Sequence, residues 1–150
     1  GDEANLTVLL EGGAPVWIRM GLGSPDYASL VDLQSEWAYH DQGEDLGSEW
    51  TAADYDDADW DSGNAELGYG DGDEATTVSY GDNASDKHIT TYFRHAFEYT
   101  GESGSGMEGL LRLRRDDGAV VYLNGVEIMR SNMPDGFVNS ESNHRTSILT

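Results

Sequence analysis

The stretch ITTYFRHAFEY, residues 89–99, is the strongest indicator of the fold because β-branched and aromatic residues dominate it. Its side chains alternate, so that Phe93, Phe97 and Tyr99 share one face, while Tyr92 and Arg94 share the other. A period of two over this length is typical of a β-strand. We therefore expect a strand whose phenylalanine face packs into a hydrophobic core.

The residues that follow predict two more strands and a hairpin. The segment LLRLR, residues 110–114, alternates strictly, and AVVYL, residues 119–123, is apolar almost throughout. The second pattern is typical of a strand covered on both faces. Asn124-Gly125 comes next, and this dipeptide is the strongest short-range signal for a hairpin. Residues 126–129 are therefore expected to return as the paired strand.

The residues before this region also favour β-structure. Residues 6–10 and 16–20 are expected to form strands, and Trp37 and Tyr39 are expected to point to one face because they are two positions apart. The acidic, aromatic residues 48–63 predict a long loop with one helical turn. Short strands between frequent glycine turns predict an all-β fold, an antiparallel β-sandwich.

Composition limits the possible partners. The chain has 150 residues, the length of one domain, and no cysteine, which excludes disulfides and thiolate metal sites. Its 29 acidic and 8 basic residues give a formal net charge of -21, which repels the phosphates of nucleic acids. No run of about 18 apolar residues occurs, so we expect no membrane insertion. A highly acidic chain with a single lysine, Lys87, is typical of a marine or halophilic source.

A series of motifs then becomes recognisable. It comprises W-x-Y-x-D-x-G-x-D-L-G-x-x-W (37–50), YDDADWDSG (55–63), LGYGDGDEAT (67–76), ITTYFRHAF (89–97) and RDDGAVVYLNGVEIMRSNMPDG (115–136). The series resembles galactose-binding-like jelly-roll accessory domains of large secreted bacterial proteins, which stand beside metallophosphoesterase, lamin-tail and spore-coat-kinase-like modules. It is also similar to the sugar-binding domain of β-galactosidase-type glycosidases. The resemblance implies a jelly roll and a secreted, extracellular or cell-surface location.

The resemblance covers residues 35–140 of a single domain, 1–150, in which residues 1–34 are atypical N-terminal strands. Domains of this family usually continue beyond the Met-Pro-x-Gly loop with further strands, which are absent before Thr150. A sandwich without these strands exposes strand edges, and strand addition from a neighbouring copy is one physical remedy.

Aromatic side chains provide the first candidates for ligand binding. An exposed ring beside polar groups is the usual surface on which a sugar stacks. The candidates for such a platform are Trp37, Trp50, Trp60, Tyr69 and Tyr80. We expect Trp37 and Trp60 to pack inside the protein, and we expect Trp50 and Tyr69 to be the exposed, ligand-binding members.

Two charged residues complete the predicted ligand site. Arg94 either forms an ion pair with one of the many carboxylates or clamps the carboxylate of a sugar. Asp117 either holds backbone N–H groups in a tight turn or binds sugar hydroxyls.

Acidic loops provide candidate metal ligands. Asp71, Asp73 and Glu74 surround a glycine, and Asp56 and Asp57 lie in a second acidic run. Calcium is bound by several such oxygens at about 2.3–2.6 Å. The alternative is that both runs are solvated loops or helix caps, so the sequence offers a structural Ca²⁺ site as a hypothesis.

Catalysis finds no support in the motifs. The histidines His40, His88, His95 and His144 show no H-x-x-x-H spacing, and neither a G-x-S-x-G elbow nor a phosphate loop occurs. We therefore expect a non-catalytic extracellular binding or adhesion module for polysaccharide. The alternatives are a structural subunit of an extracellular filament or surface layer, assembled by strand exchange between copies, and a fragment of a phosphoesterase or glycosidase.

Overall fold

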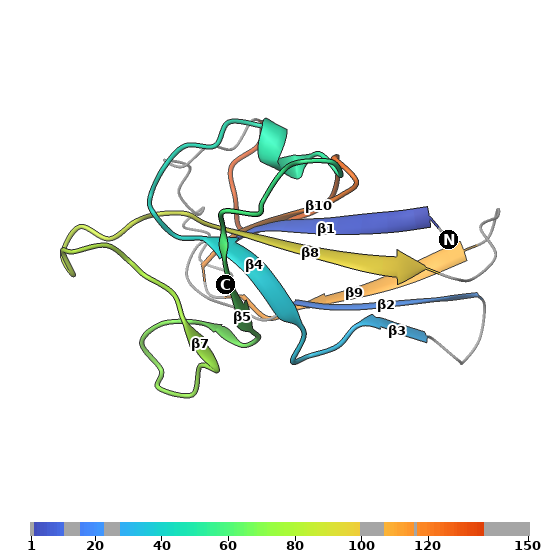
Figure 1. Ribbon diagram of the computed structural model, residues 1–150, viewed down its shortest axis with the longest axis horizontal. Helices are drawn as coiled ribbons and strands as arrows, with labels where there is room; N and C mark the ends of the chain where they lie inside the picture. The colour runs from blue at the N-terminus through green and yellow to red at the C-terminus, as the bar shows by residue number, and fades with distance from the viewer. Residues whose placement is uncertain (1, 11–15, 23–27, 100–106, 116, 137–150) are drawn as a thin grey trace, which may run out of the picture.

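The computed structural model describes residues 2–10, 16–22, 28–99, 107–115 and 117–136, and this part of the chain is nearly all β (Figure 1). Its elements in chain order are β1 (Asp2–Leu10), β2 (Val16–Leu22), β3 (Ala28–Val31), β4 (Glu36–His40), the 3₁₀ helix η1 (Glu49–Thr51), β5 (Asp61–Asn64), β6 (Leu67–Gly68), β7 (Thr76–Thr77), β8 (Thr91–Tyr99), β9 (Met107–Leu113), β10 (Ala119–Leu123) and β11 (Val126–Ser131). None of the described residues forms a helix that is long and apolar enough to cross a membrane.

The larger sheet has six strands in the order β11-β10-β1-β8-β4-β5, and each neighbouring pair is antiparallel. The first strand lies at its centre, because β1 pairs with β10 along one side and with β8 along the other. The smaller sheet has the order β3-β2-β9 and is also antiparallel. The two N-terminal strands predicted from the sequence therefore exist, but they belong to different sheets.

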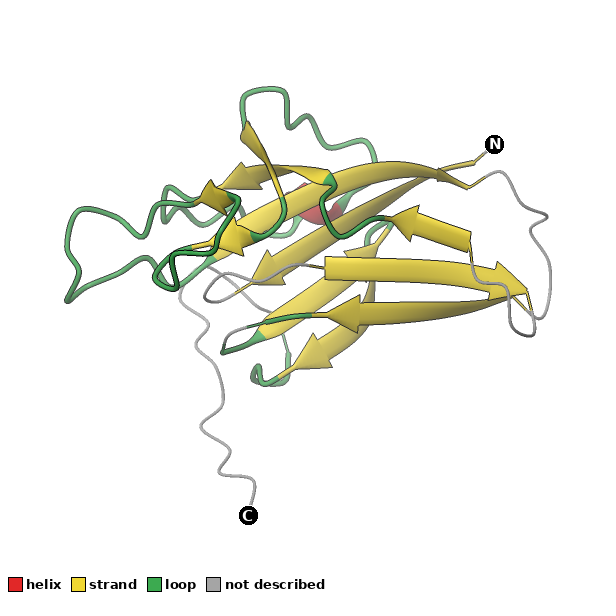
Figure 2. Ribbon diagram, turned by 90° about the horizontal axis from the view of Figure 1, so that it is seen from below, coloured by secondary structure: helices red, strands yellow, loops and turns green. Residues whose placement is uncertain are grey.

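The main core lies between these two sheets (Figure 2). Trp37, Phe93 and Phe97 contribute from the larger sheet, and Val31 and Leu111 contribute from the smaller one. This arrangement confirms the predicted phenylalanine face of β8. It also confirms the antiparallel, β-sandwich-like character of the fold.

A second cluster lies on the opposite face of the larger sheet. Tyr92 and Val120 emerge there from β8 and β10, between residues of the main core that point the other way. The segment that covers them is residues 41–60, which we call the cover loop; it contributes Leu46, Trp50, Tyr55 and Trp60. As predicted, β10 is thus buried on both faces. Residues 48–60 form a loop with one turn of 3₁₀ helix, but the predicted loop ends too late, because residues 61–63 belong to β5 and pair with β4.

The hairpin between β10 and β11 has the predicted two-residue connection. Asn124 and Gly125 have φ values of 49° and 79°, and a type I′ turn requires a positive φ at both positions. The register shifts between Val121 and Tyr122, which marks a β-bulge in the β11 edge.

A side lobe, residues 65–88, projects from the sandwich (Figure 1). It contains the short parallel pair β6 and β7. Ala65, Leu67 and Val78 are buried in the main core. The lobe is therefore attached to the sandwich by apolar packing, and its loops lie at the surface.

Candidate functional site

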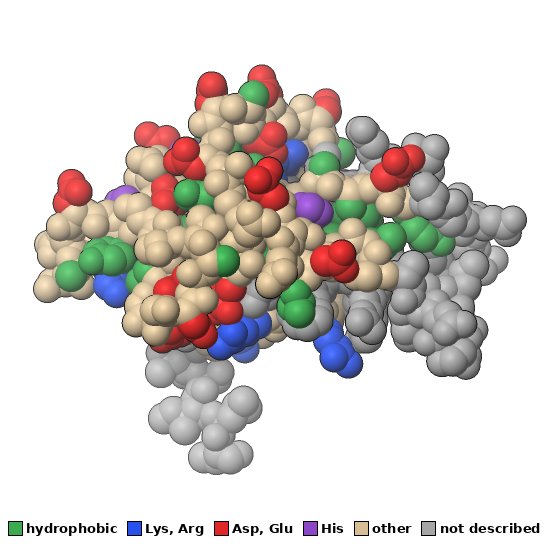
Figure 3. Space-filling model, turned by 60° about the horizontal axis from the view of Figure 1, so that its bottom comes forward, with side chains coloured by type: hydrophobic (Ala, Val, Ile, Leu, Met, Phe, Trp, Pro, Cys, Tyr) green, Lys and Arg blue, Asp and Glu red, His purple; other side chains and the backbone are tan. Residues whose placement is uncertain are grey.

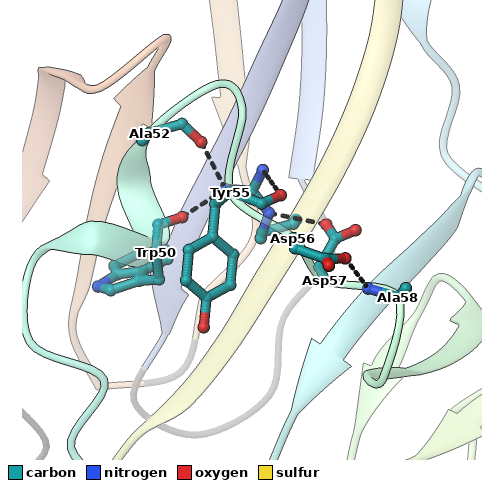
Figure 4. Close-up of polar contacts among 7 residues, drawn as sticks. Trp50, Ala52, Tyr55, Asp56, Asp57 and Ala58 are labelled. Carbon is teal, nitrogen blue, oxygen red and sulfur yellow. Dashed lines mark hydrogen bonds and ion pairs between the residues drawn. The ribbon is translucent and has the colours of Figure 1, made fainter.

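Arg94 holds the cover loop against the outer face of the larger sheet. Its side chain is 2% exposed, and Nε donates to Oδ2 of Asp57 at 2.7 Å. The remaining guanidinium nitrogens donate to the carbonyl oxygens of Trp50, Ala52 (3.1 Å) and Tyr55 (3.4 Å), which converge in Figure 4. One buried cation therefore satisfies three loop carbonyls and one carboxylate.

The Tyr55 ring adds a further contact to this cation. The guanidinium carbon of Arg94 lies 5.2 Å from the ring centroid, within the range of a cation–π interaction. Asp57 is 36% exposed, so the guanidinium of this ion pair is shielded from solvent while the carboxylate is accessible to it. This geometry favours the ion-pair alternative for Arg94, because the guanidinium already faces protein acceptors.

The expected exposure of Trp50 is wrong. Its side chain is 2% exposed, and it packs edge-on against Tyr92 and Tyr122, with ring centroids 5.0 and 5.6 Å apart. The prediction failed because Tyr92 and Tyr122 are far from Trp50 in the sequence. The spacing of residues 37–50 does not reveal which strands this loop covers. Trp37 is buried in the main core, and Trp60 is half-buried against the second cluster, where it helps to anchor the cover loop.

The side lobe carries a different aromatic group at the surface. The rings of Tyr69 and Tyr80 are half-buried and lie 5.0 Å apart, tilted by 60°. Nζ of Lys87 lies 4.6 Å from the first ring centroid and 4.9 Å from the second. We call these three residues the tyrosine clasp. Of the two aromatic residues chosen from the sequence for ligand binding, only Tyr69 belongs to it.

The clasp is held in place by a buried aspartate and a histidine. Asp41 accepts a hydrogen bond from the backbone N–H of Ser79 at 2.6 Å through Oδ2, and its carbonyl accepts one from Nδ1 of His88 at 2.8 Å. The imidazole leaves no room for a side chain at Gly43 or Gly81, where an added Cβ would lie 2.6 or 2.7 Å from ring atoms. These contacts fix the loop that links Tyr80 to Lys87.

The acidic turn beside the clasp is organised by its own carboxylate. Glu74 accepts hydrogen bonds from the backbone N–H groups of Asp71 and Gly72, each at 2.9 Å. These bonds hold the pKa of Glu74 below its usual value. Both oxygens of Glu74 are therefore engaged within the turn, while Asp71 and Asp73 are exposed.

The other predicted metal ligands lie in the cover loop. Asp56 accepts from the backbone N–H of Ala58 at 3.1 Å, and Asp57 is paired with Arg94. In the parts of the chain that the structure describes, no three carboxylate or histidine side chains converge on a point that could hold a metal ion. Calcium stays a prediction of the sequence.

Asp117 lies at the turn that precedes β10. It has a φ of 58° and is exposed, and its carbonyl accepts hydrogen bonds from Arg115 and from Asn132 (3.0 Å). Its neighbour Asp116 lies outside the described residues, as do residues 137–140 of the family-like region and His144.

The sequence indicated Tyr80 as a possible member of the aromatic platform but not as one of its ligand-binding residues, and it indicated no site role for Lys87. The available signal was that Lys87 is the only lysine of a chain with a net charge of -21. Acidic side chains are spread over the face shown in Figure 3, where basic ones are few.

A scan against protein-family models finds no match, and no curated protein or solved structure matches the chain.

Proposed function

We propose that this chain is a non-catalytic binding module that recognises glycans through the tyrosine clasp. The observation that carries this proposal is the pair of half-exposed rings, Tyr69 and Tyr80, on a lobe at the edge of the sandwich. The apolar face of a pyranose ring packs on such surfaces, while its hydroxyl groups need nearby polar partners. The exposed carboxylates of Asp71 and Asp73, in the turn that follows Tyr69, supply acceptors of this kind.

The rigidity of the clasp supports the same proposal. The Asp41 and His88 contacts hold the loop on one side, and the Glu74 carboxylate holds the turn on the other. A ligand that binds to a surface already ordered loses less of its binding free energy to the ordering of loops. The clasp therefore meets the structural requirement for recognition of a flexible polysaccharide.

Tyr80→Ala is expected to lower glycan affinity about fivefold, because a stacked aromatic ring contributes on the order of 1 kcal/mol. Tyr80→Phe keeps the ring and should retain binding. Isothermal titration of a panel of neutral, acidic and amine-bearing oligosaccharides would measure the effect. Tyr80 is the better position for this test than Tyr69, which also packs against the main core.

Leu33→Ala provides the control for this test, since Leu33 is an exposed apolar residue in the turn before β4. Equal affinity of the wild type and Tyr80→Ala for every bound oligosaccharide would remove the clasp from the proposal. Failure of the whole panel to bind would remove glycan recognition itself.

The sequence resemblance supports two finer parts of this proposal. A galactose-binding-like jelly roll would place its loops at the ends of the sandwich, as carbohydrate-binding domains do. A secreted location would expose the module to polysaccharide, and a salty environment would screen its charge.

The β11 edge favours a second candidate, a subunit that assembles with copies of itself. Val126 and Ile128 are 64% and 46% exposed on this strand, which ends the larger sheet. Exposed β-branched residues on an edge strand favour pairing with another strand. Since the register shift near Val121 twists this edge, we expect a weak contact.

Self-association through β11 should strengthen as salt screens the charge of -21. Ile128→Lys should reduce association because it places a charge on the pairing edge, while Leu33→Lys, an equal charge change elsewhere, should not. Sedimentation velocity at high concentration and in about 1 M salt would measure both, where the Debye length is roughly 3 Å. A monomer throughout this range would exclude this candidate.

A further inference from the structure

We propose that the tyrosine clasp selects sugars that carry a free amine, and that Lys87 occupies the position of that amine when no ligand is bound. This inference rests on the proposed glycan-binding function and names its ligand class. The chemical class is a protonated amino sugar, such as a glucosamine unit of a polysaccharide.

The geometry of Lys87 is the first support. Its ammonium lies within 5 Å of two ring centroids, 4.6 Å from Tyr69 and 4.9 Å from Tyr80. A cation is attracted by the negative face of an aromatic ring when it lies within about 6 Å of the centroid. The two rings thus already hold one ammonium group, so the site has the shape and electrostatics that a second ammonium needs.

The position of Lys87 provides the second support. The side chain is exposed, and no salt bridge of the described residues involves Lys87. A long side chain held by a cation–π contact at the surface leaves readily, since such contacts are weak in water. Lys87 can therefore move into solvent while a ligand amine takes its place over the rings.

The charge of the whole chain provides the third support. A net charge of -21 attracts cations and repels anions, so amine-bearing polymers approach the surface more readily than uronic or sulfated ones. Asp71 and Asp73 lie two and four residues after Tyr69, and Asp82 and Asp86 lie in the loop between Tyr80 and Lys87; all four are exposed. These carboxylates are close to the clasp residues in the sequence, and their negative charge favours a cationic ligand over an acidic one.

The test compares two oligosaccharides that differ in one group. Isothermal titration at about 150 mM salt, where the Debye length is roughly 8 Å, would use oligomers of glucosamine and of N-acetylglucosamine. We expect the wild type to bind the glucosamine oligomer about fivefold more tightly, because acetylation removes the cation. We expect Tyr80→Ala to lose this preference.

Lys87→Ala distinguishes competition from a general effect of charge. Removal of the internal occupant should raise affinity for the glucosamine oligomer by roughly two- to fivefold, which matches the strength of an exposed cation–π contact. Arg112→Ala removes an equal charge from an exposed position on β9 and should leave affinity unchanged.

Three results would overturn the inference. Equal binding of the two oligomers would leave a glycan-binding module without amine selection. Unchanged binding of the glucosamine oligomer to Tyr80→Ala would show attraction by the overall charge alone. Failure of both oligomers, together with every other oligosaccharide of the panel, would remove the proposed function as well.

Discussion

Arg94→Met is expected to lower the free energy of unfolding by about 3 kcal/mol, because removal of one partner of a buried ion pair leaves the other groups unsatisfied. The carbonyls of Trp50 and Ala52 would lose their donor, and Asp57 would lose its cation. For a chain of this length the loss corresponds to a fall in melting temperature of about 10 °C. Thermal unfolding followed by circular dichroism would measure it.

Two further variants make this prediction specific. Arg112→Met removes the same charge from an exposed position on β9 and is expected to change the melting temperature by less than about 2 °C. Arg94→Lys keeps the charge but lacks the planar fork that reaches several acceptors, so its stability should lie between those of the wild type and Arg94→Met. Equal melting temperatures for Arg94→Met and Arg112→Met would show that the cover loop does not depend on Arg94.

Trp50→Ala is expected to lower the free energy of unfolding by about 3–5 kcal/mol, since the substitution empties a buried space the size of an indole ring. The rings of Tyr92 and Tyr122 would lose their edge-on neighbour, and the cover loop would lose its largest apolar anchor. Urea unfolding, with the midpoint and slope fitted separately, would give the change.

The same variant distinguishes packing from ligand stacking. Trp50→Phe fills part of the space and should recover part of the stability. Tyr80→Ala, a half-buried aromatic in the side lobe, should cost far less stability than Trp50→Ala. A Trp50→Ala protein with wild-type stability and no glycan binding would restore the original interpretation of Trp50 as a stacking surface.

Part of the regular structure followed from local pattern, whereas β3, β5, β6 and β7 were not predicted. The alternation in residues 89–99 located β8 and its two faces, and the apolar run 119–123 indicated burial on both sides. Asn124-Gly125 located the hairpin, because its φ requirements are a local property. Such features depend on neighbours within a few residues, and for this reason one sequence is enough to predict them.

The candidate site was only partly predictable, because its members are distant in sequence. Tyr69 comes from the connection between β6 and β7, and Tyr80 and Lys87 come from the loop before β8, and no periodic pattern links them. A ligand site requires exposed side chains. Arg94 and Trp50 are instead buried, because the cover loop folds over the larger sheet.

The sequence by itself determined the positions of β8, β10 and the hairpin to β11, which faces of β8 and β10 are apolar, and that the chain is acidic. The tertiary structure decided that β1 lies at the centre of the larger sheet, that the cover loop buries Trp50 against Tyr92 and Tyr122, and that two tyrosine rings contact one exposed lysine. The physical reason is distance along the sequence. Side-chain periodicity is a property of adjacent residues. Burial of a face depends on which remote segment covers it with the smallest loss of conformational entropy and the largest gain of contact.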